Sequence, residues 1–228
     1  MDKSAWRTAL DTGWSAAQSN RIPAIAMWIF GVAIVVGYFF IPPVHNALEA
    51  VGRLKSSFGW KFSLISTGIF GGLIPAIIAW LVKNDGGKTT LGIIISSTLL
   101  WAYKGVEIDL FYRFQAWLFG DNAGLSTILI KTFVDQMVMV PTFGMVSVVL
   151  FYHWRDCGYS RKKFVATLGK NWYSRRVLPV LIANWVIWIP AVAMIYGLPI
   201  ALQLPVQNLI LCFWVLILMF FTGEEGAE

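Results

Sequence analysis

Charged residues are scarce in this sequence. They make up 13% of its 228 residues, whereas hydrophobic residues make up 57%. Soluble globular domains usually contain about 25% charged residues, so the composition excludes an ordinary soluble domain. Long stretches contain no Lys, Arg, Asp or Glu at all, among them residues 22–48, 62–82, 89–103 and 177–223. The composition therefore predicts a protein that lies within a lipid bilayer.

The sequence is also poor in the residues that most often carry chemistry. Its two histidines are His45 and His153, and no metal-ligand motif joins them to each other or to a cysteine. Its two cysteines are Cys157, in a basic connection, and Cys212, within the last apolar stretch, so we expect no disulfide between them. The residues DGGKTT, 85–90, resemble the end of a phosphate-binding loop but lack its first glycine. We therefore expect a protein that is not an enzyme and holds neither a metal nor another cofactor.

The long apolar stretches predict membrane-spanning helices. In lipid only helices and closed barrels satisfy their backbone polar groups, and these runs lack the alternation of barrel strands. Because about 20 helical residues cross the hydrocarbon core, we predict an all-α, polytopic transmembrane bundle of about six spans, with four or five as alternatives. The expected spans are residues 22–41, 62–82, 89–119, 132–152, 177–197 and 200–222. The last two share one uncharged stretch, which we expect to turn back at Gly197-Leu198-Pro199 because proline interrupts a helix.

The expected domain organisation is simple. Residues 1–21 carry Trp6, Leu10 and Trp14 four residues apart, a spacing typical of an amphipathic helix that lies on a membrane surface. Residues 22–223 are expected to form a single transmembrane domain, and residues 224–228 an acidic tail.

The cations are distributed unevenly along the chain. In the six-span arrangement, the N-terminus and the loops at 83–88 and 153–176 lie on one side of the membrane and carry 12 of the 18 Lys and Arg. The positive-inside rule then places both termini on the cytoplasmic or equivalent face. The loop at 153–176 is therefore expected to orient the protein, and secondarily to attract anionic lipids or a partner through Arg161, Lys162, Lys163, Arg175 and Arg176. We do not expect nucleic-acid binding, because membrane topology accounts for these cations.

Glycines and prolines within the expected spans predict close helix contacts and bends. Gly68 and Gly72 form a GxxxG pattern, which favours tight packing of one membrane helix on another. Prolines stand where helices are expected to bend or break, at Pro75, Pro141, Pro190 and Pro199.

The region 89–119 places four charges within an expected span. Lys104 and Glu107 are three residues apart, and Asp109 and Arg113 are four apart, so each pair is expected to be neutralised along the helix.

Other polar side chains also fall inside the expected spans. Amides in a membrane most often join neighbouring helices, whereas an ionisable group there more often marks a functional site. Asp135 is the fourth residue of the expected span 132–152 and four residues from Lys131, so we expect it near the positive end of the helix dipole and paired with that lysine. The candidate pore or polar-network residues are Lys131, Asp135, Gln136, Thr142, Asn184, Gln203, Gln207 and Asn208.

Several sequence segments resemble a known family. The segment DLFYRFQAWLFGD precedes IKTFVDQMVMVP, and NWVIWIPAVAMIYGLP follows, with Trp214 fifteen residues past Pro199. In its order and spacing this pattern resembles the Mpv-seventeen and 22-kilodalton peroxisomal membrane protein family over about residues 60–220. The sequence departs from the family pattern at Ile189, which separates Trp188 from Pro190, and at Gln203, where a basic residue is usual. The additional span at 22–41 points to a divergent branch.

The resemblance implies a membrane protein of the channel-like, solute- or ion-permeating kind. We expect a small solute or a cation to pass, with Asp135 favouring cations, and homo-oligomers are compatible with this role. The alternative is a structural protein that organises lipids or a partner without transport. A bacterial inner membrane is the expected location, with a mitochondrial or peroxisomal membrane as the alternative.

Overall fold

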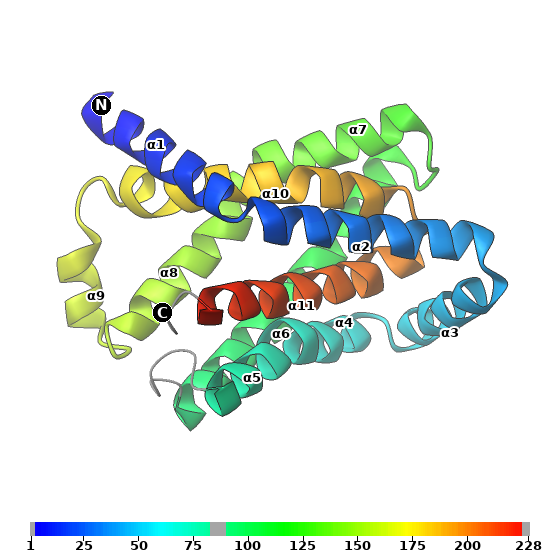
Figure 1. Cartoon of the computed structure of the whole chain (residues 1–228), viewed down its shortest axis with the longest axis horizontal. Helices are drawn as coiled ribbons and strands as arrows, with labels where there is room; N and C mark the ends of the chain where they lie inside the picture. The colour runs from blue at the N-terminus through cyan, green and yellow to red at the C-terminus, as the bar shows by residue number, and fades with distance from the viewer. Residues whose placement is uncertain (1–2, 83–89, 225–228) are drawn as a thin grey trace. The chain divides into compact units, whose positions relative to one another are not determined.

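The computed structural model describes residues 3–82 and 90–224, and within them the chain is helical between short turns (Figure 1). Segments labelled η are π-helical, with one extra residue in each hydrogen-bonded turn. The elements are α1 (Lys3–Ser19), α2 (Arg21–Phe40), α3 (Pro42–Phe58), α4 (Trp60–Thr67), η1 (Gly68–Leu73), α5 (Ile74–Val82), α6 (Leu91–Phe119), α7 (Leu125–Val134), η2 (Asp135–Gly144), α8 (Met145–Asp156), α9 (Arg161–Leu168), η3 (Tyr173–Val177), α10 (Leu178–Tyr196) and α11 (Ile200–Glu224).

Six continuous helices in the described part of the chain are long and apolar enough to cross a membrane. They are Arg21–Phe40, Trp60–Leu81, Leu91–Phe119, Leu125–Asp156, Tyr173–Tyr196 and Ile200–Leu218. This result confirms the all-α fold and the expected number of spans. The chain also turns at Gly197-Leu198-Pro199, where α10 ends and α11 begins, as the sequence predicts.

Most span boundaries lie within four residues of the prediction, and two features differ more. The fourth span begins at Leu125 rather than at residue 132, so Asp135 is the first residue of η2 in the middle of a long helix. The placement of Asp135 near a helix N-terminus was therefore wrong, because the turn at residues 120–124 is followed directly by helix. The connection after the first span also forms a helix of its own, α3, which begins at Pro42; proline is favourable in a first helical turn.

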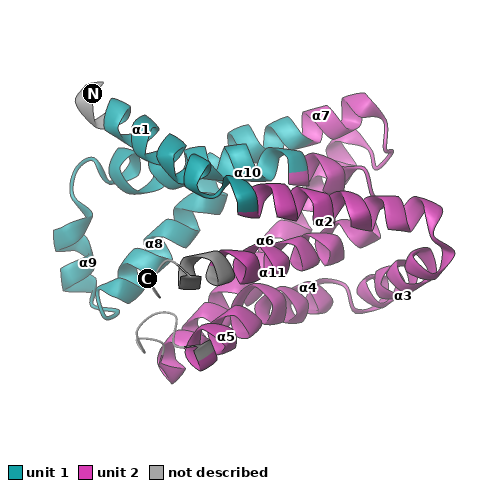
Figure 2. Ribbon diagram, in the orientation of Figure 1, with its two compact units in different colours: residues 1–22, 132–190 teal, residues 23–131, 191–228 magenta. Residues whose placement is uncertain are grey.

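The chain divides into two compact units (Figure 2). Unit 1 contains residues 1–22 and 132–190, and unit 2 contains residues 23–131 and 191–228. Each unit combines segments that are far apart in the sequence. The expected division into a surface segment, one membrane domain and a tail stays a prediction, and the loop at 83–88 and residues 225–228 lie outside the described residues.

Unit 1 is organised around the start of α10. Ala9 of α1 packs with Leu178, Leu181 and Ile182 of α10, and Trp6 extends this cluster. Residues 3–19 therefore form a helix that is bound to its own unit through an apolar face. The expectation that this helix lies on a membrane surface stays a prediction.

Unit 2 is held together by very close helix contacts. A Cβ atom on Gly105 of α6 would lie 2.2 Å from the backbone oxygen of Ser63 in α4. On Gly72 of η1 it would lie 2.7 Å from the Cα of Thr98, and on Gly68 it would lie 3.1 Å from the Cβ of Ala102. The backbones of α4, η1 and α6 therefore approach each other at positions where a larger side chain would not fit.

Candidate functional site

Helix α6 has an unusual distribution of side chains for a membrane span. Its buried residues are mostly polar: Ser97, Lys104, Asp109, Tyr112 and Gln115, along with Leu100 and Gly105. Its exposed large side chains are mostly apolar: Leu91, Ile95, Leu99, Tyr103, Leu110, Phe114, Trp117 and Leu118. Polar side chains inside and apolar ones outside suit a helix that faces lipid on one side and a polar interior on the other.

The middle of the α6 polar face is ionic. Asp109 is fully buried and its carboxylate forms ion pairs with two cations, Lys55 Nζ at 2.8 Å and Arg113 Nη2 at 2.9 Å. Lys104 pairs with Glu107 one turn earlier, so both pairs predicted along this helix are confirmed. Lys55 comes from α3, and the ion pair therefore holds that connecting helix against a membrane span.

The C-terminal end of the polar face is made of phenols and amides. The Tyr112 hydroxyl donates to Gln207 Oε1 on α11, and Gln115 Nε2 donates to the Tyr196 hydroxyl on α10. The two tyrosine rings meet edge to face with centroids 5.2 Å apart. Lys131 Nζ lies 5.8 Å from the centroid of the Tyr196 ring, a cation–π contact that balances part of the cost of burying an ammonium group.

Some buried oxygen atoms of unit 2 have no hydrogen-bond partner within the described part of the chain. They include Gln115 Oε1, Gln203 Oε1 and Ser63 Oγ. The amide nitrogen of Gln203 does bond, to the carbonyl of Leu198 at 3.0 Å. Buried polar atoms are almost always paired with protein or with water, so these oxygens mark places where water or a solute with a hydrogen-bond donor can be held.

Asn208 joins α11 to α4. Its Oδ1 accepts from the hydroxyl of Thr67 at 2.9 Å, and its Nδ2 donates to Ser66 Oγ at 3.0 Å. Both ends of the amide are thus satisfied. Asn208 therefore acts in unit 2 as a cross-link between two spans.

Unit 1 contains a separate polar network around Gln136. Gln136 Nε2 donates to Asp135 Oδ1 at 3.0 Å, and Gln136 Oε1 accepts from Asn184 Nδ2 of α10 at 3.2 Å. All three residues were predicted as polar-network members, and the structure brings them together.

The backbone of η2 explains why this network sits where it does. In a π-helix each N–H bonds the carbonyl five residues earlier. Because Pro141 has no N–H, the carbonyl of Gln136 lacks its helical partner. The indole N–H of Trp185 donates to that carbonyl at 2.6 Å, and the carbonyl of Pro141 accepts from the Tyr173 hydroxyl at 2.9 Å. The proline is thus accommodated by two side chains from the following span.

The remaining predicted polar residues lie apart from these networks. Thr142 is exposed, and its hydroxyl donates to the carbonyl of Val138 in its own helix, so the structure does not bring it to Asp135. Lys131 belongs to unit 2 and Asp135 to unit 1. The pairing expected between them stays a prediction.

The structure also locates the prolines that were expected at bends and the cations of the 153–176 loop. Pro75 follows η1 within α5, Pro141 lies inside η2, Pro190 inside α10, and Pro199 directly before α11. Arg161, Lys162 and Lys163 are exposed in the first turn of α9, Arg175 is exposed in η3, and Arg176 Nη2 donates to the carbonyl of Thr167 at 3.1 Å.

Several members of the unit 2 site were missed by sequence reasoning. Gln115 and Tyr112 could have been found, because Ser97, Lys104, Asp109, Tyr112 and Gln115 follow a roughly helical spacing. Lys55 and Tyr196 gave no such signal, since only the tertiary structure brings a residue of α3 and a residue at the end of α10 to α6.

Within the described residues, no group of three or more His, Cys, Asp or Glu is arranged to hold a metal ion. Comparison of the chain with family models, with curated proteins and with solved structures found no match.

Proposed function

We propose that this integral membrane protein is channel-like, and that a small polar solute or cation permeates along the polar face of α6 in unit 2. The observation that carries the proposal is the reversed polarity of α6, whose buried face is polar and ionic while its exposed face is apolar. Ionisable residues are costly within a membrane, and they commonly mark the paths of ions and solutes.

The dimensions of the polar face agree with this proposal. From Ser97 to Gln115 the face covers 18 residue steps, which is about 27 Å of helix rise. The hydrocarbon core of a bilayer is about 30 Å thick. The polar side chains from Lys104 to Gln115 cover about 17 Å of that depth, and Ser97 extends the face beyond the buried Leu100.

The unpartnered oxygens support the same role. Gln115 Oε1 and Gln203 Oε1 are buried without a protein donor in the part of the chain that is described, and they can accept from water or from a permeating solute. The resemblance to the Mpv-seventeen and 22-kilodalton peroxisomal membrane protein family implies a role of the same kind, and we propose membership of that family on the residues that carry it.

The test is flux through reconstituted protein. Purified wild-type protein in liposomes is expected to pass potassium ions or a small neutral solute, measured by an entrapped potassium indicator and by liposome swelling. The double variant Gln115→Leu/Gln203→Leu removes both unpartnered oxygens and should lower the flux at least tenfold.

Thr142→Val is the matched control, because it removes a polar group from a membrane span without touching the α6 face, and it should leave the flux unchanged. Folding of each protein is checked by gel filtration and circular dichroism. Folded wild-type protein that passes neither probe would refute the proposal, as would a double variant that conducts like wild type.

A second candidate function is that of a structural membrane protein without transport. The observation that favours it is the pairing of polar side chains between helices, as in Tyr112 with Gln207 and Thr67 with Asn208. It predicts no flux from any of the folded proteins, so the same experiment separates the two functions.

A further inference from the structure

Helix α9 lies in the connection between two candidate spans. The span Leu125–Asp156 ends directly before Cys157, and the span Tyr173–Tyr196 begins at Tyr173. A short connection between two membrane helices keeps α9 within reach of the lipid headgroups. No residue of α9 is buried, so the helix presents its side chains to its surroundings along its whole length.

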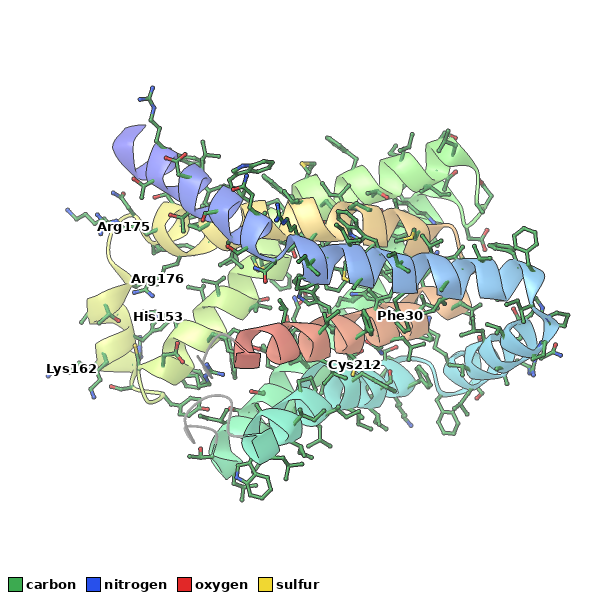
Figure 3. The ribbon with its side chains drawn as sticks, viewed as in Figure 1. Phe30, His153, Lys162, Arg175, Arg176 and Cys212 are labelled. Carbon is green, nitrogen blue, oxygen red and sulfur yellow. The ribbon has the colours of Figure 1, made fainter. Side chains whose placement is uncertain are left out.

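The charges of this connection are almost all positive. Arg161, Lys162, Lys163 and Arg175 are exposed, and none of them forms an ion pair with a described residue. Asp156, the last residue of the preceding span, pairs with Arg155 beside it, and residues 157–172 include no acidic residue. Figure 3 shows Lys162 and Arg175 extending away from the ribbon, whereas Arg176 turns toward α9.

Two aromatic side chains stand at the corner between α8 and α9. Trp154 and Tyr159 are each 39% exposed, and their rings meet edge to face at 5.1 Å. Aromatic rings of this kind prefer the headgroup level of a bilayer. Tyr159 has a φ of 58°, which is unfavourable for a bulky residue, so the backbone is strained at this corner.

The orientation of α9 is set by Thr167. Its hydroxyl lies 3.0 Å from His153 Nε2 of α8, and its carbonyl accepts from Arg176 of η3. The helix is thus fixed on both sides, and the cations of its first turn do not take part in holding it. Val165, at 64% exposure, adds an apolar side chain on the same short helix.

We propose that α9 and the α8–α9 corner form a binding site for anionic phospholipid headgroups. Arg161, Lys162, Lys163 and Arg175 would bind the headgroup phosphates, while Trp154, Tyr159 and Val165 contact the boundary between headgroups and acyl chains. Charge complementarity carries this assignment, because exposed cations without acidic partners lie where lipid phosphates are the nearest anions. The site is independent of the α6 polar face.

The test compares two double variants with the same loss of charge. Arg161→Gln/Lys162→Gln removes two cations of the site. Arg53→Gln/Lys61→Gln removes an exposed Arg of α3, between the first two spans, and an exposed Lys in the first turn of α4. Each purified full-length protein is incubated in neutral detergent with equal amounts of phosphatidylglycerol and phosphatidylcholine. Retained lipid is then counted by native mass spectrometry.

Wild type should retain phosphatidylglycerol preferentially, and the α9 variant should lose that preference by about fivefold for each cation removed at low salt. The Arg53→Gln/Lys61→Gln control should retain it, and inorganic phosphate at the same concentration should not displace the lipid. Equal retention of the two lipids by wild type, or an equal loss in both variants, would overturn the proposal. Displacement by inorganic phosphate would overturn it too, in favour of a general anion site.

Discussion

At the scale of single residues, a few small or polar side chains decide whether the helices of this protein fit together. Gly105 is the tightest of these positions, because any side chain would meet both the backbone of Ser63 and the side chain of Thr67. Thr67 in turn donates a hydrogen bond to Asn208 of α11, so the same residue contacts two other helices.

We expect Gly105→Ala to lower the free energy of unfolding by about 1 to 3 kcal/mol, since the added methyl group has to displace the backbone of α4. Gly92→Ala is the control in the same helix, because a Cβ there would meet only Thr90 Oγ1 at 3.8 Å. Thermal unfolding in detergent, followed by circular dichroism, measures both. A Gly105→Ala protein as stable as the Gly92→Ala protein would contradict the close contact.

At the scale of elements, the π-helical segment η2 depends on a neighbouring helix. Its proline leaves the Gln136 carbonyl without a helical partner, and Trp185 of α10 supplies the missing donor. The two segments are therefore coupled by a hydrogen bond to the backbone as well as by the amides of Gln136 and Asn184.

Trp185→Phe should cost about 1 to 2 kcal/mol of stability, because it keeps an aromatic ring but leaves the buried carbonyl unpaired. Trp188→Phe is the matched control, three residues further along α10, and its indole has no hydrogen bond to a described residue. Chemical unfolding in mixed micelles compares the two variants. Equal losses would show that ring size, rather than the indole N–H, matters at residue 185.

Helix α3 gives a second prediction at this scale, because a buried ion pair holds it to α6. Lys55→Met should destabilise the protein by about 3 to 5 kcal/mol, since it leaves the fully buried Asp109 with only the half-exposed Arg113. Lys55→Met/Asp109→Leu removes both charges and should recover most of that loss. If the double variant is no more stable than Lys55→Met, the ion pair does not account for the position of α3.

At the scale of the whole molecule, the six spans and the cation distribution together predict on which side of the membrane each connection lies. Ser57 follows the first span and Lys162 lies between the fourth and fifth spans, so they are expected on opposite sides of the membrane.

Ser57→Cys and Lys162→Cys are made separately in a Cys157→Ser/Cys212→Ser background. Only Ser57→Cys should react with a membrane-impermeant maleimide applied to intact cells. Reaction of both from outside would contradict the six-span topology, and reaction of Lys162→Cys alone would reverse the predicted orientation.

Much of the fold was determined by the sequence itself, because lipid imposes a simple rule. Uncharged runs of about 20 residues have to be helical in a membrane, and Pro199 has to end one, so the number of spans and the turn before α11 follow from the positions of charges and prolines. The pairs along α6 follow equally from spacing within one helix.

The tertiary structure alone decided which polar groups meet. Gln207 and Gln203 are four residues apart, yet one bonds Tyr112 of α6 and the other bonds the carbonyl of Leu198. Asp135 was expected at a helix end, and it lies inside a long helix, where it accepts a hydrogen bond from Gln136. The physical reason is that periodicity fixes which face of a helix a residue occupies, whereas the partner on that face comes from a helix distant in the sequence.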